Sequence, residues 1–103
     1  MHGMTIVVEY QIPYEQLWYK KRFQIQDNLT IKQLKKLILK DLALRGLDPN
    51  HPNHFKYGIF DASETEFAEE EIVYKIMQNN QQVKLNMFQS IDGVIGRQIV
   101  QSN

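Results

Sequence analysis

Residues 21–42 read KRFQIQDNLTIKQLKKLILKDL, and this stretch decides the fold. Its first six residues alternate, with Phe23 and Ile25 apolar between polar neighbours, which predicts a strand with one buried face. A turn follows, in which Asn28 or Thr30 is placed to cap a helix. Apolar residues at helical spacing then predict that helix: Ile31, Leu34, Leu37, Ile38 and Leu42. A half-buried strand and an amphipathic helix indicate a sheet with the helix packed on its apolar face.

Further elements are expected on both sides of this stretch. Residues 5–12 and 54–60 are rich in β-branched and aromatic residues, and the apolar alternation over 83–87 predicts a last strand. Residues 71–76 predict a single helical turn. Residues 90–103 contain breakers and no sustained period, so we interpret them as a linker to further domains of the same chain.

Composition limits the class of protein. The 103 residues are enough for one domain, and their formal net charge is zero, which argues against a nucleic-acid partner. The absence of cysteine excludes a disulfide scaffold, thiolate zinc sites and a cysteine nucleophile. No apolar run approaches the roughly 20 residues of a membrane span. We therefore expect a cytoplasmic protein.

No residue pattern predicts a catalytic or metal centre, so we expect neither an enzyme nor a cofactor. The serines have no partners of triad type nearby, and the chain has no glycine-rich phosphate loop. His51 and His54 lie near Asp48, but their setting among prolines is typical of solvated loop residues. The acidic stretch 61–71 lacks the alternating ligands and central glycine of a calcium loop.

Charge is unevenly distributed along the chain. Residues 1–60 carry nine Lys/Arg and five Asp/Glu, whereas residues 61–103 carry three and seven. Residues 20–45 hold eight basic and two acidic side chains, and residues 61–71 hold six acids and no base. This distribution predicts one basic and one acidic docking face; the alternative is an uneven solubilising surface.

The order of expected elements is similar to that of the ubiquitin-like superfold over residues 4–89. The supporting residues are the β-branched first strand at 5–8, the capped helix, and the Tyr-Lys-Ile turn at 74–76 before the final strand. The resemblance implies an α+β fold, a β-grasp with a mixed sheet of four to five strands and one main helix on one face. The chain ends in Val-Gln-Ser-Asn at 100–103 rather than in the Gly-Gly tail of conjugated modifiers, which favours a recognition module.

A basic edge strand beside a basic helix resembles Ras-binding and FERM-type domains, and most of all the N-terminal GTPase-binding region of a formin. That resemblance implies a regulator of the actin cytoskeleton that binds a Ras- or Rho-type small GTPase at the cell cortex. The residues implied in that contact, or in lipid binding, are Arg22, Gln24, Lys32, Lys36 and Lys40. The alternative is that these like charges only protect the edge strand from aggregation.

The segment between the first two strands predicts a membrane-binding loop. Aromatic rings beside a basic triplet are typical of an interface with acidic, phosphoinositide-containing membrane. The expected membrane-binding residues are Tyr14, Leu17, Trp18, Tyr19, Lys20, Lys21 and Arg22. The alternative is that Trp18 folds back as a lid over the core. This hypothesis implies a peripherally membrane-associated protein.

A different class of function keeps the same fold. The acidic stretch 61–71 of one copy would meet the basic patch of the next copy, and such head-to-tail contacts form open filaments.

Overall fold

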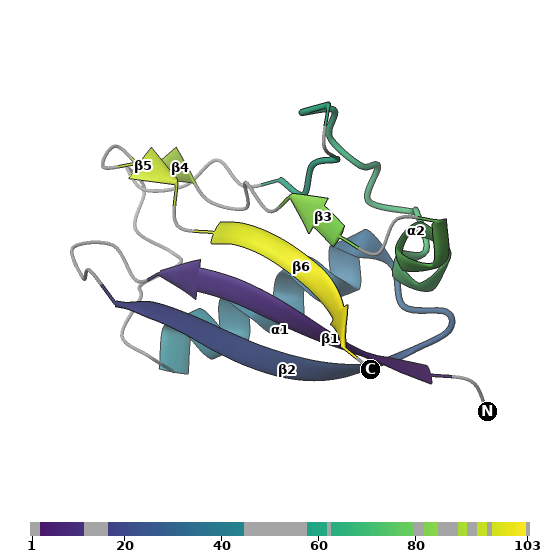
Figure 1. Ribbon diagram of the computed structural model, residues 1–103, viewed down its shortest axis with the longest axis horizontal. Helices are drawn as coiled ribbons and strands as arrows, with labels where there is room; N and C mark the ends of the chain where they lie inside the picture. Colours follow the sequence, from purple (N-terminus) through teal and green to yellow (C-terminus); the bar gives the residue numbers. More distant parts are fainter. Residues whose placement is uncertain are drawn as a thin grey trace.

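The computed structural model describes residues 3–11, 17–44, 58–61, 63–79, 82–84, 89–90, 93–94 and 96–102. They form a small α+β structure, in which a sheet carries helices on one side (Figure 1). In chain order the elements are β1 (Gly3–Gln11), β2 (Trp18–Gln26), α1 (Ile31–Leu44), α2 (Val73–Asn79), β3 (Gln82–Lys84), β4 (Gln89–Ser90), β5 (Gly93–Val94) and β6 (Gly96–Ser102).

The main sheet has the strand order β2-β1-β6-β3, and β4 with β5 forms a separate two-stranded sheet. Three of the main strands are long, whereas β3 has three residues. Within the described residues, every pairing between strands is antiparallel. The expected mixed sheet is therefore wrong for this part of the chain, and a β-grasp arrangement is not confirmed.

β1 and β2 form a long hairpin that is paired from Gly3 opposite Gln26 to Gln11 opposite Trp18. The apolar side of β1 faces the helices, since Ile6, Val8 and Tyr10 are fully buried. The expected strand at residues 21–26 is confirmed, but β2 begins three residues earlier. Backbone pairing with β1 extends it through residues that we expected in a loop.

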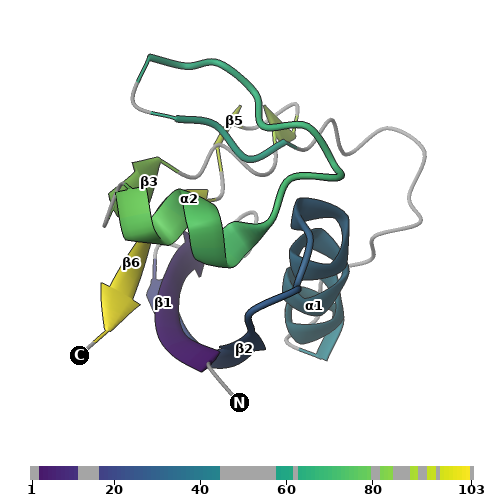
Figure 2. The same ribbon diagram turned by 90° about the vertical axis from the view of Figure 1, so that its right-hand side faces the viewer.

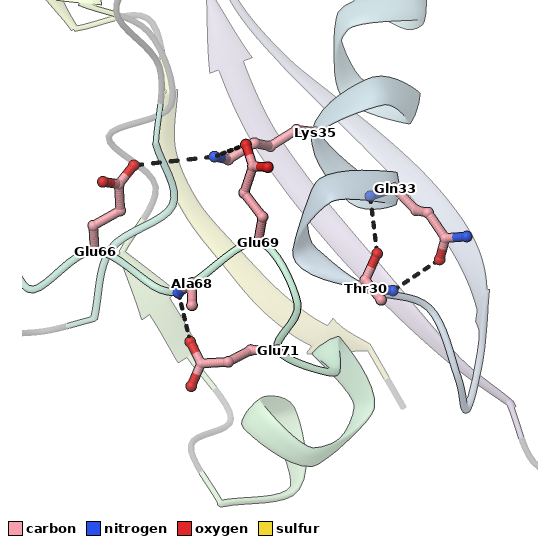
Figure 3. A network of polar contacts seen from close by, with 7 residues as sticks. All are labelled: Thr30, Gln33, Lys35, Glu66, Ala68, Glu69 and Glu71. Atoms are coloured by element: carbon pink, nitrogen blue, oxygen red, sulfur yellow. Dashed lines mark hydrogen bonds and ion pairs between the residues drawn. The ribbon is translucent and has the colours of Figure 1, made fainter.

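The helix α1 is confirmed by its cap and by its buried stripe. Thr30 accepts a hydrogen bond from the Gln33 N–H through Oγ1 (3.3 Å), and the Thr30 N–H donates to Gln33 Oε1 (2.9 Å; Figure 3). This reciprocal pair is a capping box, which satisfies two backbone donors at the start of the helix. Ile31, Leu34, Ile38 and Leu42 are buried, as their spacing predicts, whereas Leu37 is 37% exposed.

The core lies between the sheet and the two helices, which cover the same face (Figure 2). Both strands of the β1–β2 hairpin, both helices and β6 contribute side chains to the core. The buried apolar residues are Met4, Ile6, Val8, Tyr10, Ile25, Ile31, Leu34, Ile38, Leu42, Ile59, Val73, Met77 and Ile99. Burial of each large apolar side chain stabilises the folded state by about 1.5–3 kcal/mol. This cluster therefore holds the helices against the sheet.

The segment between the helices is anchored by backbone hydrogen bonds. Of the expected strand 54–60, residues 54–57 lie outside the described residues, and Phe60 forms only an isolated bridge with Glu66. The Phe67 N–H donates to the Ile59 carbonyl at 2.8 Å, and this pairing places the acidic stretch beside α1. The expected helical turn at 71–76 is in fact α2, a helix of seven residues.

The largest correction concerns the expected linker at residues 90–103. Residues 96–102 form β6, which pairs with β1 on one side and with β3 on the other. Ile99 is only 1% exposed and belongs to the core. Of the expected last strand at 83–87, residues 83–84 are described, and they belong to β3, which lies next to β6. The structure therefore extends the domain to residue 102.

Candidate recognition surface

Side chains of β2 point alternately to the two faces of the sheet. The basic triplet at residues 20–22 is therefore divided between these faces. Tyr19 faces the core side, where its ring stacks on Tyr10 with centroids 6.3 Å apart. Lys21 also points to that side and pairs with Asp41 of α1 at 3.9 Å. Trp18, Lys20 and Arg22 have the opposite parity and lie on the face away from the helices, here called the outer face.

The expected membrane-binding residues therefore do not share one face, because Trp18, Lys20 and Arg22 lie on the outer face and Tyr19 and Lys21 on the core side. Tyr14 lies outside the described residues. Leu17 is 68% exposed, but Tyr19 is directed into the structure, and the Arg97 guanidinium covers the ring of Trp18 at 3.6 Å. The alternative of a Trp18 lid over the core is also wrong, because the ring lies on the outer face.

Lys32, Lys36 and Lys40 lie on the solvent side of α1, and all three are exposed. Asp41 marks the flank of α1 that faces β2, because it pairs with Lys21. At about 100° per residue, the three lysines lie roughly 180°, 140° and 100° around the helix from Asp41. The helix lysines and the basic side chains of the outer face are thus separate surfaces, whereas we expected one continuous basic site.

β2 forms one edge of the main sheet. It pairs with β1, and within the described residues no strand pairs with its opposite edge. Lys20, Arg22 and Gln24 are exposed along this edge. The expectation of a basic edge strand is therefore confirmed, with its charge on the outer face. An edge of this kind offers backbone donors and acceptors to a further strand, and its lysine and arginine select for an acidic one.

On the outer face, the buried carboxylate of Glu9 in β1 binds two residues of β6. Glu9 is 7% exposed, its Oε1 lies 3.1 Å from Arg97 Nη1, and its Oε2 accepts a hydrogen bond from Gln98 Nε2 at 3.2 Å. The β1–β6 register shifts between Glu9 and Tyr10, so Arg97 is the extra residue of a bulge. A bulge redirects side chains, and here two successive residues of β6 reach the same carboxylate.

The same face contains an open depression of about 260 Å³, here called the outer-face depression. Strands β1, β2 and β6 all contribute to its wall and floor. It is lined by Val7, Glu9, Lys20, Gln98, Val100 and Gln101. Val7 and Val100 are opposite each other in the β1–β6 register and are half-buried, so the depression has an apolar floor with a cation at its β2 side.

The acidic stretch is engaged within the chain. Lys35 is only 5% exposed, and its Nζ lies 3.7 Å from Glu69 and 4.0 Å from Glu66 (Figure 3). Glu71 Oε2 accepts the Ala68 N–H at 2.8 Å. The Lys35 ion pairs hold the stretch against α1, in addition to backbone hydrogen bonds from the start of the helix to the Glu69 and Glu71 carbonyls.

Asp61 is also used locally, since its Oδ1 accepts the N–H groups of Ser63 and Thr65 at 2.9 Å. The head-to-tail hypothesis places the acidic stretch against a second copy. Several of its carboxylates, however, already bind donors of their own chain. Its carboxylates at Glu66 and Glu69 remain about half exposed.

Among the described residues, no group of three or more His, Asp or Glu side chains is arranged to hold a metal ion. His51 and His54 lie outside these residues. Within the same part of the chain, no helix has the length and apolar character needed to cross a bilayer.

Three residues that shape the outer face, namely Glu9, Arg97 and Gln98, were missed at the level of sequence. Arg97 and Gln98 fell in the expected linker, and Glu9 resembled an ordinary solvent-facing residue of a strand. The β-branched pair Ile99-Val100 was a signal for a strand beside Arg97 and Gln98.

Comparisons of the chain with models of protein families, with curated proteins and with solved structures found no match. The resemblance to Ras-binding domains and to formins thus stays a prediction.

Proposed function

We propose that this domain is a noncatalytic recognition module, which binds an acidic protein partner along the β2 edge. The observation that carries the proposal is the exposed edge strand with Lys20 and Arg22 on its outer face. Main-chain hydrogen bonds from the edge would supply affinity, and the cations would supply orientation and a fast encounter.

The first partner to test is a Ras- or Rho-type small GTPase, which the sequence resemblance implies. The geometry changes the expected contact residues. Arg22 and Gln24 on β2 remain candidates, and Lys20 joins them, whereas Lys32 and Lys36 belong to a separate surface. A role as a cortical, formin-like regulator of the cytoskeleton is part of the same proposal.

The test is a titration of the isotopically labelled domain with small GTPases of both families, each loaded with a GTP analogue. We expect backbone amides of β2 to shift more than those of α1. Lys20→Glu with Arg22→Glu should weaken binding by about 1–3 kcal/mol, or roughly 5- to 150-fold in Kd, since exposed pairs are worth up to about 1 kcal/mol and reversal adds repulsion.

The matched control is Lys32→Glu with Lys36→Glu, which changes the net charge equally on the exposed side of α1. We expect this control to reduce only the long-range attraction, so its effect should vanish at high salt. If no GTPase moves a β2 amide, the GTPase proposal fails. If the two charge reversals weaken binding equally, the β2 edge is not the contact.

Acidic membrane is the second candidate partner, favoured by one specific observation. Leu17 is 68% exposed and lies in sequence near the exposed Lys20. Sedimentation with phosphoinositide-containing vesicles tests this candidate: Leu17→Ser should reduce vesicle binding and leave GTPase binding unchanged. Equal binding to neutral and acidic vesicles would exclude the proposed electrostatic contribution.

A further inference from the structure

The outer face of the sheet combines an apolar floor with basic side chains. Two cross-strand rows make up its centre. One row contains Lys20, Glu9 and Gln98, and the next row contains Arg22, Val7 and Val100. The outer-face depression lies over these rows, with Val7 and Val100 half-buried at its floor.

Among the described residues, this face carries more basic than acidic side chains. Glu9 is its one acid among the described residues, and Arg97 already pairs with that carboxylate. Lys20 lines the depression, and Arg22 is exposed one row away on the same strand. A group that enters the depression thus meets apolar carbon on the β1 and β6 side and positive charge on the β2 side.

This pattern selects among possible occupants. A second copy of the chain that docked by the same face would bring Lys20 and Arg22 against identical cations, which is unfavourable. A lipid surface would need apolar side chains that project outward, whereas Val7 and Val100 are recessed to half-burial. An acidic protein segment complements both the charge and the recess.

We propose that the outer-face depression receives one aliphatic side chain of an acidic protein segment, whose flanking carboxylates meet Lys20 and Arg22. The inference rests on the proposed recognition function and names the feature that the partner must present. The volume of about 260 Å³ suits a single large side chain rather than a whole helix. Displacement of water from Val7 and Val100 would then add affinity to the electrostatic attraction.

The probe is a pair of synthetic peptides, acetyl-Asp-Glu-Leu-Glu-Asp-amide and its analogue with Ser in place of Leu. Each is titrated into the labelled domain at low salt and followed by amide shifts. We expect the Leu peptide to shift the amides of Val7, Lys20 and Val100, and to bind roughly fivefold more tightly than the Ser peptide.

Two variants and their controls locate the contact. Val100→Thr keeps the side-chain shape and should remove most of the preference for Leu over Ser, whereas Val100→Ile should keep it. Lys20→Glu should weaken both peptides by about tenfold, and Lys36→Glu on α1 should have a much smaller effect. Dispersed amide spectra confirm that each variant is folded.

Several outcomes would overturn the inference. Equal affinity for the two peptides would show that charge alone attracts them, and an unchanged Leu preference in Val100→Thr would place the side chain elsewhere. Sedimentation showing a dimer that Val100→Thr disperses would identify a second copy as the occupant. Vesicle binding that is lost in Val100→Thr would identify a membrane instead.

The same variants separate this inference from the proposed function. If a GTPase binds at β2 and Val100→Thr leaves its affinity unchanged, the recognition function stands and the aliphatic contact is refuted. If the Leu peptide binds at the depression but no GTPase binds, the aliphatic contact stands and the GTPase partner is refuted.

Discussion

The substitution Arg97→Ala tests how much the ion pair with the buried carboxylate of Glu9 stabilises the folded state. The pair is separated by 3.1 Å, which corresponds to about 5 kcal/mol of attraction at an effective dielectric of 20. The Arg97 side chain is 50% exposed, whereas that of Glu9 is only 10% exposed. Solvation of the arginine and desolvation of the acid offset part of the attraction, so we take about 2–3 kcal/mol as its net loss.

Arg97→Ala also removes the cation from the ring of Trp18, a loss of about 0.5–1 kcal/mol. The expected destabilisation is thus about 3 kcal/mol. With a urea m-value of about 1–3 kcal/mol/M, the midpoint of unfolding should fall by about 1–3 M. Circular dichroism and the fluorescence of Trp18, the single tryptophan of the chain, give two independent readouts.

The decisive comparison is the double variant Glu9→Gln with Arg97→Ala. It lacks the same cation, but no longer buries an uncompensated negative charge. We expect it to be more stable than Arg97→Ala alone by about 1–2 kcal/mol. If the double variant is equally or less stable, the carboxylate is not buried as a charge that depends on Arg97.

Three further predictions concern the scaffold around this surface. Thr30→Ala removes the cap of α1 and should lower stability by about 1 kcal/mol, a fall of roughly 4–8 °C in Tm by thermal denaturation, whereas the exposed Lys32→Ala should change Tm little. Lys35→Met should change the free energy of unfolding by less than about 1 kcal/mol, because Glu66 and Glu69 are half exposed. Amide hydrogen exchange at Phe67 should nevertheless become faster. Unchanged exchange would show that the ion pairs do not hold the acidic stretch against α1. Truncation after residue 95 should abolish cooperative unfolding, because it removes Ile99 from the core and the β1–β6 pairing, whereas a linker could be removed without effect.

The parts of the fold that follow a short local period were predictable. The stripe of α1 and the alternation of Phe23 and Ile25 each match a single buried side, so sequence spacing and burial coincide. A cap at Asn28 or Thr30 was also predictable, and it lies at Thr30, whose hydrogen bonds join residues three positions apart. Local geometry alone determines these features.

β6 was not predictable by the same means. Its stability depends on pairing with β1, about 90 residues earlier in the chain, and Ile99 is the one buried apolar side chain among its described residues. The bulge at Arg97 also interrupts the two-residue period from which a strand is inferred. The breakers in residues 90–103 and the missing period therefore resembled a linker, although residues 96–102 form a strand of the main sheet.

Lys35 shows the same limit at a single residue. It lies at the border of the apolar stripe, and the acidic stretch folds over it and leaves it 5% exposed. Glu66 and Glu69 are more than 30 positions away, and no local pattern connects them to this lysine. The interpretation of the acidic stretch as a free docking face was incomplete for the same reason.

The placement of β6 also determines what the outer face can recognise. β2 alone would present a row of cations, which attracts any acidic surface without regard to shape. β6 adds Val100 to the floor and, through Arg97, neutralises the carboxylate of Glu9 that would otherwise repel an acidic partner. On the proposed function, charge on β2 governs the rate of encounter, and the depression beside β6 governs which acidic segment stays bound. Substitutions on β2 should change mainly the association rate and its salt dependence, and substitutions at Val100 should change mainly the dissociation rate.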